Sequence, residues 1–169
     1  MNNSRHVISI LVKNYSGVLT RVSGLFARRG YNIDSLSVGK TEDDEYSRIT
    51  ITLVGDDDIT YQVIKQLEKL HDVKKIIELD PNDSVFRELI LIKVKAEPDK
   101  IATINGIVDV FRCRVIDISK DTMTIELTGD EGKTSALLDM MKDFGIKEMV
   151  RTGISGLGRG SKVLWEEIF

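Results

Sequence analysis

The stretch NYSGVLTRVSGLFARRGYNIDSL, residues 14–36, has the pattern of one helix set between two strands. Ser16 is a residue type that favours the capping position of a helix, and Gly17 follows it without a side chain. Apolar residues then recur at the spacing of one helix face, at Val18, Val22, Leu25 and Phe26. Gly30 is placed to end the helix. The sequence therefore predicts a helix over 16–28 that connects two strands.

The segments around this helix complete the order βαββαβ. HVISILVK precedes it as a strand, and NIDSLSVGK and YSRITITLVG follow as two strands joined by the acidic turn TEDDE. DDDITYQVIKQLEKL is a second helix with three aspartates at its positive end, and VKKIIELD is the last strand. The same order then recurs, with a strand VFRELILIKVKA, a helix opened by Pro98, a hairpin of RVIDIS and TMTIELT, a helix over 130–144 and a strand IKEMVRTGIS.

The order βαββαβ is that of the ferredoxin-like fold. We therefore predict an α+β protein made of two tandem ferredoxin-like βαββαβ domains. Residues 1–80 form the first domain, the turn-forming PNDS at 81–84 is the linker, residues 85–157 form the second domain, and residues 158–169 are a C-terminal tail.

The first strand of each half is apolar on both faces. Val7 and Leu11 are apolar on the side opposite to Ile8 and Ile10, and ELILIKV in the second half has the same pattern. Each half has only about 75 residues, so its core is marginal. The domain's own helices cover one face of such a sheet. The other face is then either partly apolar and exposed, or covered by a second copy or another protein.

Composition limits the classes of protein to consider. The 169 residues are 41% hydrophobic and 30% charged, as in ordinary globular proteins. The single cysteine, Cys113, excludes an internal disulfide and fits a reducing cytosol. No stretch reaches the ~20 apolar residues that a membrane helix needs. We predict a cytoplasmic protein that does not enter the membrane.

Nucleic-acid binding has little support in the sequence. The net charge is −3, which gives no general attraction to a polyanion. The RNA-recognition fold shares the βαββαβ order, but it stacks bases on aromatic residues of its central strands. YSRITITLV and HVISILVK have no aromatic residue at their centres. We therefore expect no nucleic-acid partner.

Residues for catalysis or metal binding are also few. His6 opens a strand, and His71 closes a helix, where a cationic side chain is ordinary. DDD at 56–58 and TEDDE at 41–45 are explained more simply as a helix start and a turn than as a magnesium site. Cys113 follows an apolar helix and fits a small core residue. The sequence thus predicts a non-catalytic protein without a metal site.

The stretch TGDEGKTSAL resembles a phosphate-binding loop, but its spacing is wrong. Such a loop needs a glycine five residues before the glycine of GKT, and Leu127 occupies that position relative to Gly132. Asp130 and Glu131 would also repel phosphate. The later SGLGRGSK is rich in glycine, but no strand–glycine–helix unit surrounds it. Neither stretch predicts a nucleotide site.

The predicted helix start at residues 14–20 has the chemistry of a ligand site. Its free N–H groups, those of Gly17, Val18 and Leu19, point out of the helix and suit a carboxylate. The amide of Asn14 both donates and accepts, so it can hold an amino-acid head group. Asn32 and Ile33, after the glycine turn, add a polar group beside an apolar one. These groups suit a short aliphatic amino acid, and the alternative is an ordinary capped helix followed by a turn.

These residues also carry a resemblance to known families. N-x-S-G-V-L-x-R-V followed by F-x-R-R-G-Y-N-I resembles the ACT domain, a regulatory module that binds amino acids. The longer NYSGVLTRVSGLFARRGYNIDSLSVG, with RELILIKV, VFRCRVIDIS and RTGISGLGRG, is similar to the small, regulatory subunits of acetolactate synthase, up to about Gly160. Two positions depart from the pattern. Ser16 stands where many ACT domains have proline, and Cys113 stands where this family often has glycine.

The resemblance implies a function that the residues alone do not name. The chain would bind a separate catalytic subunit that uses thiamine diphosphate, magnesium and FAD, raise its activity and confer feedback inhibition by valine, with no cofactor of its own. The first domain would be an ACT domain that forms a homodimer, with valine at its interface. Carried over residue by residue, one subunit would contribute Asn14, Gly17, Val18, Leu19 and Thr20, and the other Asn32 and Ile33. The alternatives are a stand-alone amino-acid sensor that acts on another enzyme or regulator, and a small enzyme of unknown type.

Overall fold

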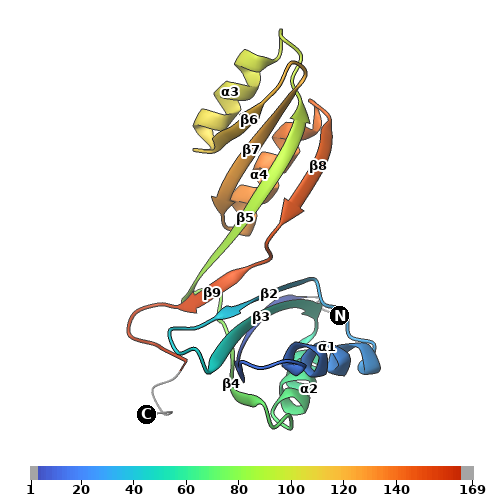
Figure 1. The fold of residues 1–169 in the computed structure, drawn as a ribbon, viewed down its shortest axis with the longest axis vertical. Coiled ribbons are helices and arrows are strands. Elements are labelled where there is room, and N and C mark those ends of the chain that lie inside the picture. Colours follow the sequence, from blue (N-terminus) through green and yellow to red (C-terminus); the bar gives the residue numbers. More distant parts are fainter. Residues whose placement is uncertain (1–3, 165–169) are drawn as a thin grey trace. The chain divides into compact units, whose positions relative to one another are not determined.

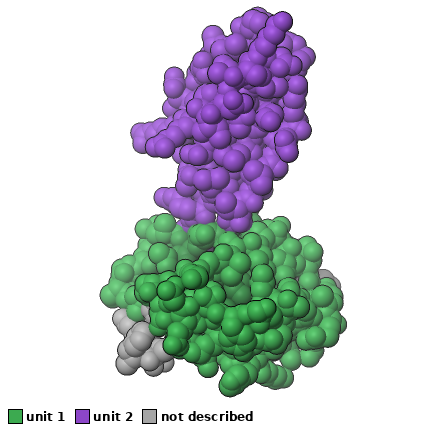
Figure 2. Space-filling model, in the orientation of Figure 1, with its two compact units in different colours: residues 1–85, 154–169 green, residues 86–153 purple. Residues whose placement is uncertain are grey.

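The chain folds into two compact units in a computed structural model that describes residues 4–164. The residues up to Val85, together with those from Ile154 on, form unit 1 (Figure 2). Phe86–Gly153 form unit 2. Unit 1 is therefore built from two separate parts of the sequence. The predicted boundary at residues 81–84 stays a prediction. The predicted C-terminal tail at 158–169 lies outside the described residues beyond Leu164.

Unit 1 contains a four-stranded antiparallel sheet and two helices (Figure 1). Its strand order is β2-β3-β1-β4, so β2 and β4 are the edge strands. The elements are β1 (Ser4–Lys13), α1 (Val18–Arg29), β2 (Ser35–Lys40), β3 (Tyr46–Gly55), α2 (Asp57–Leu67) and β4 (Val73–Glu78). This is the βαββαβ order that the sequence predicted.

Unit 2 repeats this plan. Its strand order is β6-β7-β5-β8, again antiparallel, and the short β9 (Ser155–Gly158) pairs with β5, a strand that begins in unit 1. The elements are β5 (Ser84–Lys95), α3 (Ile101–Val110), β6 (Arg114–Ile118), β7 (Thr122–Gly129), α4 (Glu131–Lys142) and β8 (Ile146–Arg151). The prediction of two ferredoxin-like α+β domains is confirmed.

The core of unit 1 lies between its sheet and its helices. In β1, Ile8 is paired with Ile51 of β3, and Ile10 with Ile49, and all four are fully buried. The predicted helix stripe packs on them, at Val18, Val22, Leu25 and Phe26 of α1 and Val63 and Leu67 of α2. The apolar residues that alternate along the strands and those that recur along one side of each helix therefore meet in the same core.

The opposite, outer face of this sheet is also buried. Val7, Ser9 and Leu11 point to that face, and they are 6%, 0% and 0% exposed. The C-terminal part of unit 1 lies on it. The Ser37 hydroxyl of β2 donates to the carbonyl oxygen of Ile154 at 3.0 Å, and the side chains of Ile154 and Leu164 are buried. We expected an exposed face or a partner here; instead, the chain covers this face itself.

Two predicted element boundaries are wrong, for backbone reasons. The predicted strand IKEMVRTGIS ends early, at Arg151 of β8; Gly153 then takes a left-handed conformation with φ +82°, and β9 begins at Ser155. Pro98 does not lie in the first turn of a helix. It sits in a turn closed by the Lys100 N–H and the Glu97 carbonyl at 2.8 Å, and α3 begins only at Ile101. Proline suits this turn position as well as it suits a helix start.

The end of α3 forms a tight turn without the glycine that the family often has there. Arg112 takes the left-handed conformation, with φ +52°. The Cys113 N–H donates to the Val108 carbonyl at 2.8 Å, and the Arg112 N–H donates to the Asp109 carbonyl at 3.0 Å, the two bonds of a Schellman motif. Cys113 itself therefore needs no left-handed conformation. Its side chain packs on the core of unit 2 as predicted, and burial raises the pKa of the thiol.

Replacing Leu11 by Ala tests whether the outer face is a core. We expect the free energy of unfolding to fall by about 2–5 kcal/mol, as for Ile10→Ala on the inner face, because both side chains are fully buried. The measurement is urea denaturation followed by circular dichroism. The control is Val54→Ala at a side chain that is 50% exposed, where a change within about 0.5 kcal/mol is expected. If Leu11→Ala resembled this control, the outer face would not be a core.

Candidate functional site

Helix α1 begins at a glycine in an unusual conformation. Gly17 is the N-cap residue, with φ +89° and ψ −12°, and no side chain caps the helix. The prediction that Ser16 is the N-cap is therefore wrong by one residue. A left-handed conformation is strained for residues with a Cβ atom, so the backbone itself favours glycine at position 17.

This start leaves three backbone donors without an acceptor among the described residues, the N–H groups of Gly17, Leu19 and Thr20. The Val18 N–H points to the Tyr15 carbonyl at 3.4 Å, and the Arg21 N–H donates to the Gly17 carbonyl at 3.0 Å. Within the described residues, the N–H groups of Leu19 and Thr20 have no acceptor, and both residues are exposed. Two adjacent N–H groups at the positive end of a helix are suited to a carboxylate.

Asn14 connects the helix start to the acidic turn between β2 and β3. Its amide nitrogen donates to the Asp44 carbonyl at 2.8 Å, and its amide oxygen accepts from the Ser47 hydroxyl at 3.0 Å. Its backbone N–H donates to the Glu45 carbonyl at 2.8 Å. Each amide atom keeps one further bonding position. The carbonyls of Asp44 and Glu45 thus lie beside Asn14, while the carboxylates of the same two residues are paired with Lys40 and Lys13.

A buried aspartate also holds the start of α1 in place. Asp72, in the turn between α2 and β4, is 5% exposed. Its carboxylate accepts hydrogen bonds from the Tyr15 hydroxyl and, at 2.5 Å, from Arg21 Nε. The bond from Tyr15 is the main reason that the pKa of Asp72 is lowered. Burial opposes this effect, and Arg21 adds to it. The same carboxylate raises the pKa of Tyr15 and of Arg21.

Sequence reasoning missed this cluster, because Asp72 is 57 positions from Tyr15 and 51 from Arg21. No local spacing signals such a contact. Its consequence at the site is steric. A Cβ atom on Gly17 would lie 3.1 Å from Arg21 Nη1, whose guanidinium is held by Asp72. The helix start is therefore positioned by packing as well as by backbone conformation.

The other two predicted residues lie at the far end of α1. Asn32 is exposed, and Ile33 packs against the core, just after the left-handed Gly30 that ends the helix as predicted. The 12 residues of α1 span about 18 Å. One chain therefore does not bring Asn32 and Ile33 together with residues 14–20. The Val18 side chain is in the core, and Leu19 is 40% exposed.

The contacts of His6 serve the structure and not catalysis. It is 8% exposed, with Nδ1 2.6 Å from Glu78 Oε1 and Nε2 2.8 Å from the Ser4 hydroxyl. A hydroxyl, an imidazole and a carboxylate in this order resemble a nucleophilic triad. The carboxylate of Asp57, however, lies 3.7 Å from Nε2 and would repel the oxyanion that such chemistry forms. The contacts join β1 to β4.

No group of three or more His, Cys, Asp or Glu side chains in residues 4–164 is arranged to hold a metal ion. None of the helices described there combines the length and the apolar character needed to cross a membrane.

Both units match family models. Residues 8–75 match the AHAS small subunit-like ACT domain, and residues 87–160 match the small subunit of acetolactate synthase. A probable acetolactate synthase small subunit of Archaeoglobus fulgidus is 51% identical over 158 residues, which cover 94% of this chain and 99% of that relative. The acetolactate synthase small subunit of Mycobacterium bovis is 45% identical over 162 residues, 96% of each chain. The crystal structure of the Thermotoga maritima small subunit superposes with a TM-score of 0.86 at 39% identity, covering 94% of this chain and 99% of that one.

The lowered pKa of Asp72 makes part of the stability dependent on pH. Because the folded pKa lies below the unfolded value of about 3.8, this stabilisation is complete above about pH 5 and is lost as the pH falls through the unfolded and then the folded pKa. Asp72→Asn should lower the melting temperature at neutral pH, and the difference from the natural chain should shrink on acidification. Thermal denaturation at a series of pH values measures it. Asp99→Asn in an exposed turn is the control, with a small difference at every pH.

Proposed function

The chain belongs to the small subunits of acetolactate synthase, non-catalytic regulatory chains, and we propose that it activates the catalytic subunit and makes it sensitive to valine. The observation that carries the valine proposal is the start of α1, where two adjacent N–H groups have no acceptor among the described residues. Matches to this family in both units favour this role over a stand-alone amino-acid sensor.

Each part of a valine molecule has a matching group at this site. Its carboxylate accepts from the N–H groups of Leu19 and Thr20. Its ammonium group faces the remaining acceptor position of Asn14 and the acidic turn at residues 41–45. Its short apolar side chain packs on the exposed part of Leu19 and on Ile33 of a second copy. The left-handed Gly17 is the N-cap that precedes these N–H groups.

Residues 14–20 and residues 32–33 form two half-sites at opposite ends of α1, and a symmetric dimer can bring a half-site of one chain next to the other half-site of its partner. β2 is an edge strand of the sheet and pairs only with β3 among the described residues. If two copies pair antiparallel along β2, the start of each β2, beside Asn32 and Ile33, lies against the end of the other. The end of β2 leads into the turn that Asn14 holds. A two-fold axis at this edge therefore gives two equivalent sites, each with one half from each chain.

Regulation follows from this shared site. Valine stabilises the dimer arrangement in which both half-sites meet, and this arrangement changes the contact with the catalytic subunit. A difference in valine affinity between the active and the inhibited assembly is required, and a coupling of about 1–3 kcal/mol is typical. Thiamine diphosphate, magnesium and FAD belong to the catalytic subunit in this proposal, and the assembly is cytoplasmic.

Titration calorimetry of the purified chain with valine tests the site. We expect one valine per chain and no heat with lysine. Gly17→Asp should weaken valine binding at least 100-fold, because its carboxylate competes for the same N–H groups. The control is Gly17→Ala, which has the same backbone strain of about 1–2 kcal/mol and no charge, and should bind within a few-fold of the natural chain. Equal valine binding by the two variants would exclude the helix start as the site.

The dimer edge has its own test. Val38 of β2 is 48% exposed, and Val54 of β3 is 50% exposed. Val38→Lys puts two like charges at the proposed two-fold edge and should shift the chain from dimer to monomer in sedimentation equilibrium. Val54→Lys is at a similarly exposed position but lies on β3, an inner strand of the sheet, and should leave the dimer intact. A Val38→Lys dimer as stable as the Val54→Lys dimer would place the interface elsewhere.

A further inference from the structure

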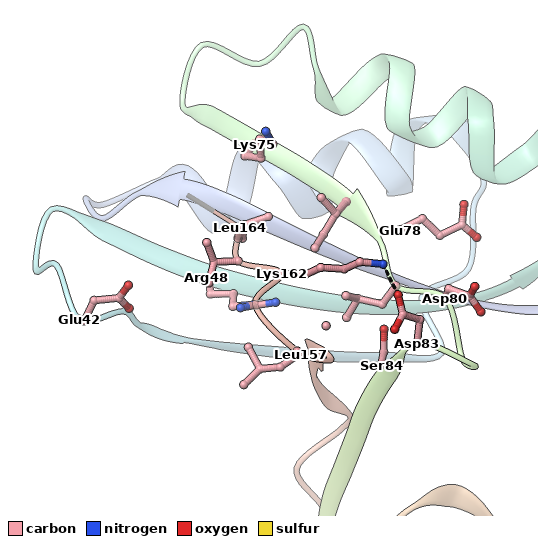
Figure 3. Close-up of a pocket in the computed structure, with 15 residues that line it drawn as sticks. Glu42, Arg48, Lys75, Glu78, Asp80, Asp83, Ser84, Leu157, Lys162 and Leu164 are labelled. Atoms are coloured by element: carbon pink, nitrogen blue, oxygen red, sulfur yellow. Dashed lines mark hydrogen bonds and ion pairs between the residues drawn. The ribbon is translucent and has the colours of Figure 1, made fainter. Parts of the chain in front are cut away.

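Unit 1 has a cavity on the outer face of its sheet, away from the helices. Its volume is about 670 Å³, within the usual range of small-molecule sites, about 300–1,000 Å³. Figure 3 shows β3 and β4 as its floor, with the C-terminal segment across it. The lining residues of this segment are Leu157, Gly158, Gly160, Lys162, Val163 and Leu164. Glu42 of the acidic turn lines this cavity, whereas Asn14, Gly17–Thr20, Asn32 and Ile33 do not.

Arg48 of β3 is the group in this cavity that needs a partner. Its Nε donates to the Ser9 hydroxyl at 2.7 Å, which holds the guanidinium plane. Its two terminal nitrogens point into the cavity (Figure 3). Within the described residues, Arg48 forms no ion pair, and burial lowers its pKa while the charge of Glu42 opposes that effect. A partly desolvated guanidinium with no carboxylate in ion-pair contact can accept an anionic ligand.

Unlike Arg48, most carboxylates around the cavity have an ion-pair or hydrogen-bond partner in the chain. Asp83 is paired with Lys162. Asp80 accepts from the backbone N–H and, at 3.2 Å, from the side-chain amide of Asn82. Glu78 lies 2.6 Å from His6 Nδ1. Glu42 is exposed to solvent. Asp83 and Lys162 thus neutralise each other, whereas Arg48 has no ion pair among the described residues.

The cavity walls define the rest of the ligand. Ile77 and Leu79 of the floor and Leu157 and Leu164 of the cover are apolar, and Ser84 is a buried residue that lines the cavity with its hydroxyl. A planar guanidinium binds a carboxylate through two parallel hydrogen bonds. We propose that this cavity binds a small aliphatic carboxylic acid with one further oxygen, such as a 2-oxo acid of three to five carbons. Arg48 holds the carboxylate, and the apolar walls contact the carbon chain.

The test is titration of the full chain with pyruvate and with 2-oxoisovalerate, and with inorganic phosphate as another anion. We expect at least one oxo acid to bind and phosphate to remain silent. Arg48→Gln should weaken this binding at least tenfold. Arg29→Gln, at the exposed end of α1, is the matched control and should bind as the natural chain does. Failure of both oxo acids to bind the natural chain, or binding of phosphate alone, would overturn the proposal.

A second variant shows whether Arg48→Gln weakens binding only because it disturbs folding. Leu157 is 60% exposed, so Leu157→Asp should leave the fold intact. The introduced carboxylate should form an ion pair with Arg48 in place of the ligand. It should reduce oxo-acid binding as strongly as Arg48→Gln. Normal oxo-acid binding by either variant would refute the site. Valine titration of the same proteins separates the two proposals, because Gly17→Asp should lose only valine and Arg48→Gln only the oxo acid.

Discussion

β1 is apolar on both faces, and the architecture of unit 1 follows from the need to bury both. Ile8 and Ile10 are covered by α1 and α2. Val7 and Leu11 have no helix over them, and they are buried because residues 154–164 return to the sheet. The stability of a domain of about this size is marginal when only one face of its sheet is buried. The return of the chain adds a second apolar layer, and it explains why unit 1 is discontinuous in sequence.

This arrangement separates three surfaces of unit 1 that would otherwise compete. The C-terminal segment occupies the outer face, where it closes over the Arg48 cavity. The helix start lies at one end of the sheet, next to the acidic turn that Asn14 holds. The edge of β2 keeps unpaired backbone groups among the described residues, which suits pairing with a second copy. A ligand at the helix start and a second chain at β2 can therefore act together without displacing the outer cover.

Local signals in the sequence predicted the elements well. The α1 stripe, the terminal Gly30 and the aspartate that caps α2, Asp56, all act within one or two helical turns. The features that were missed depend on distant residues or on backbone conformation. Ser16 has the better capping side chain, yet the chain leaving β1 needs a left-handed turn that Gly17 provides. The bonds of Asp72 to Tyr15 and Arg21 join segments more than 50 positions apart, and no periodicity records them.

The turn that carries Asp72 links the two proposed sites physically. Asp72 holds the helix start through Tyr15 and Arg21, and β4 begins at the next residue. Lys75 and Ile77 of β4 line the outer cavity. A ligand that shifts the helix start acts on the same short strand that forms the floor of the other site. Proximity alone is not coupling, which requires that each ligand prefer one of two arrangements of this strand. If β4 has two such arrangements, linkage requires valine and the oxo acid to change each other's affinity by the same factor.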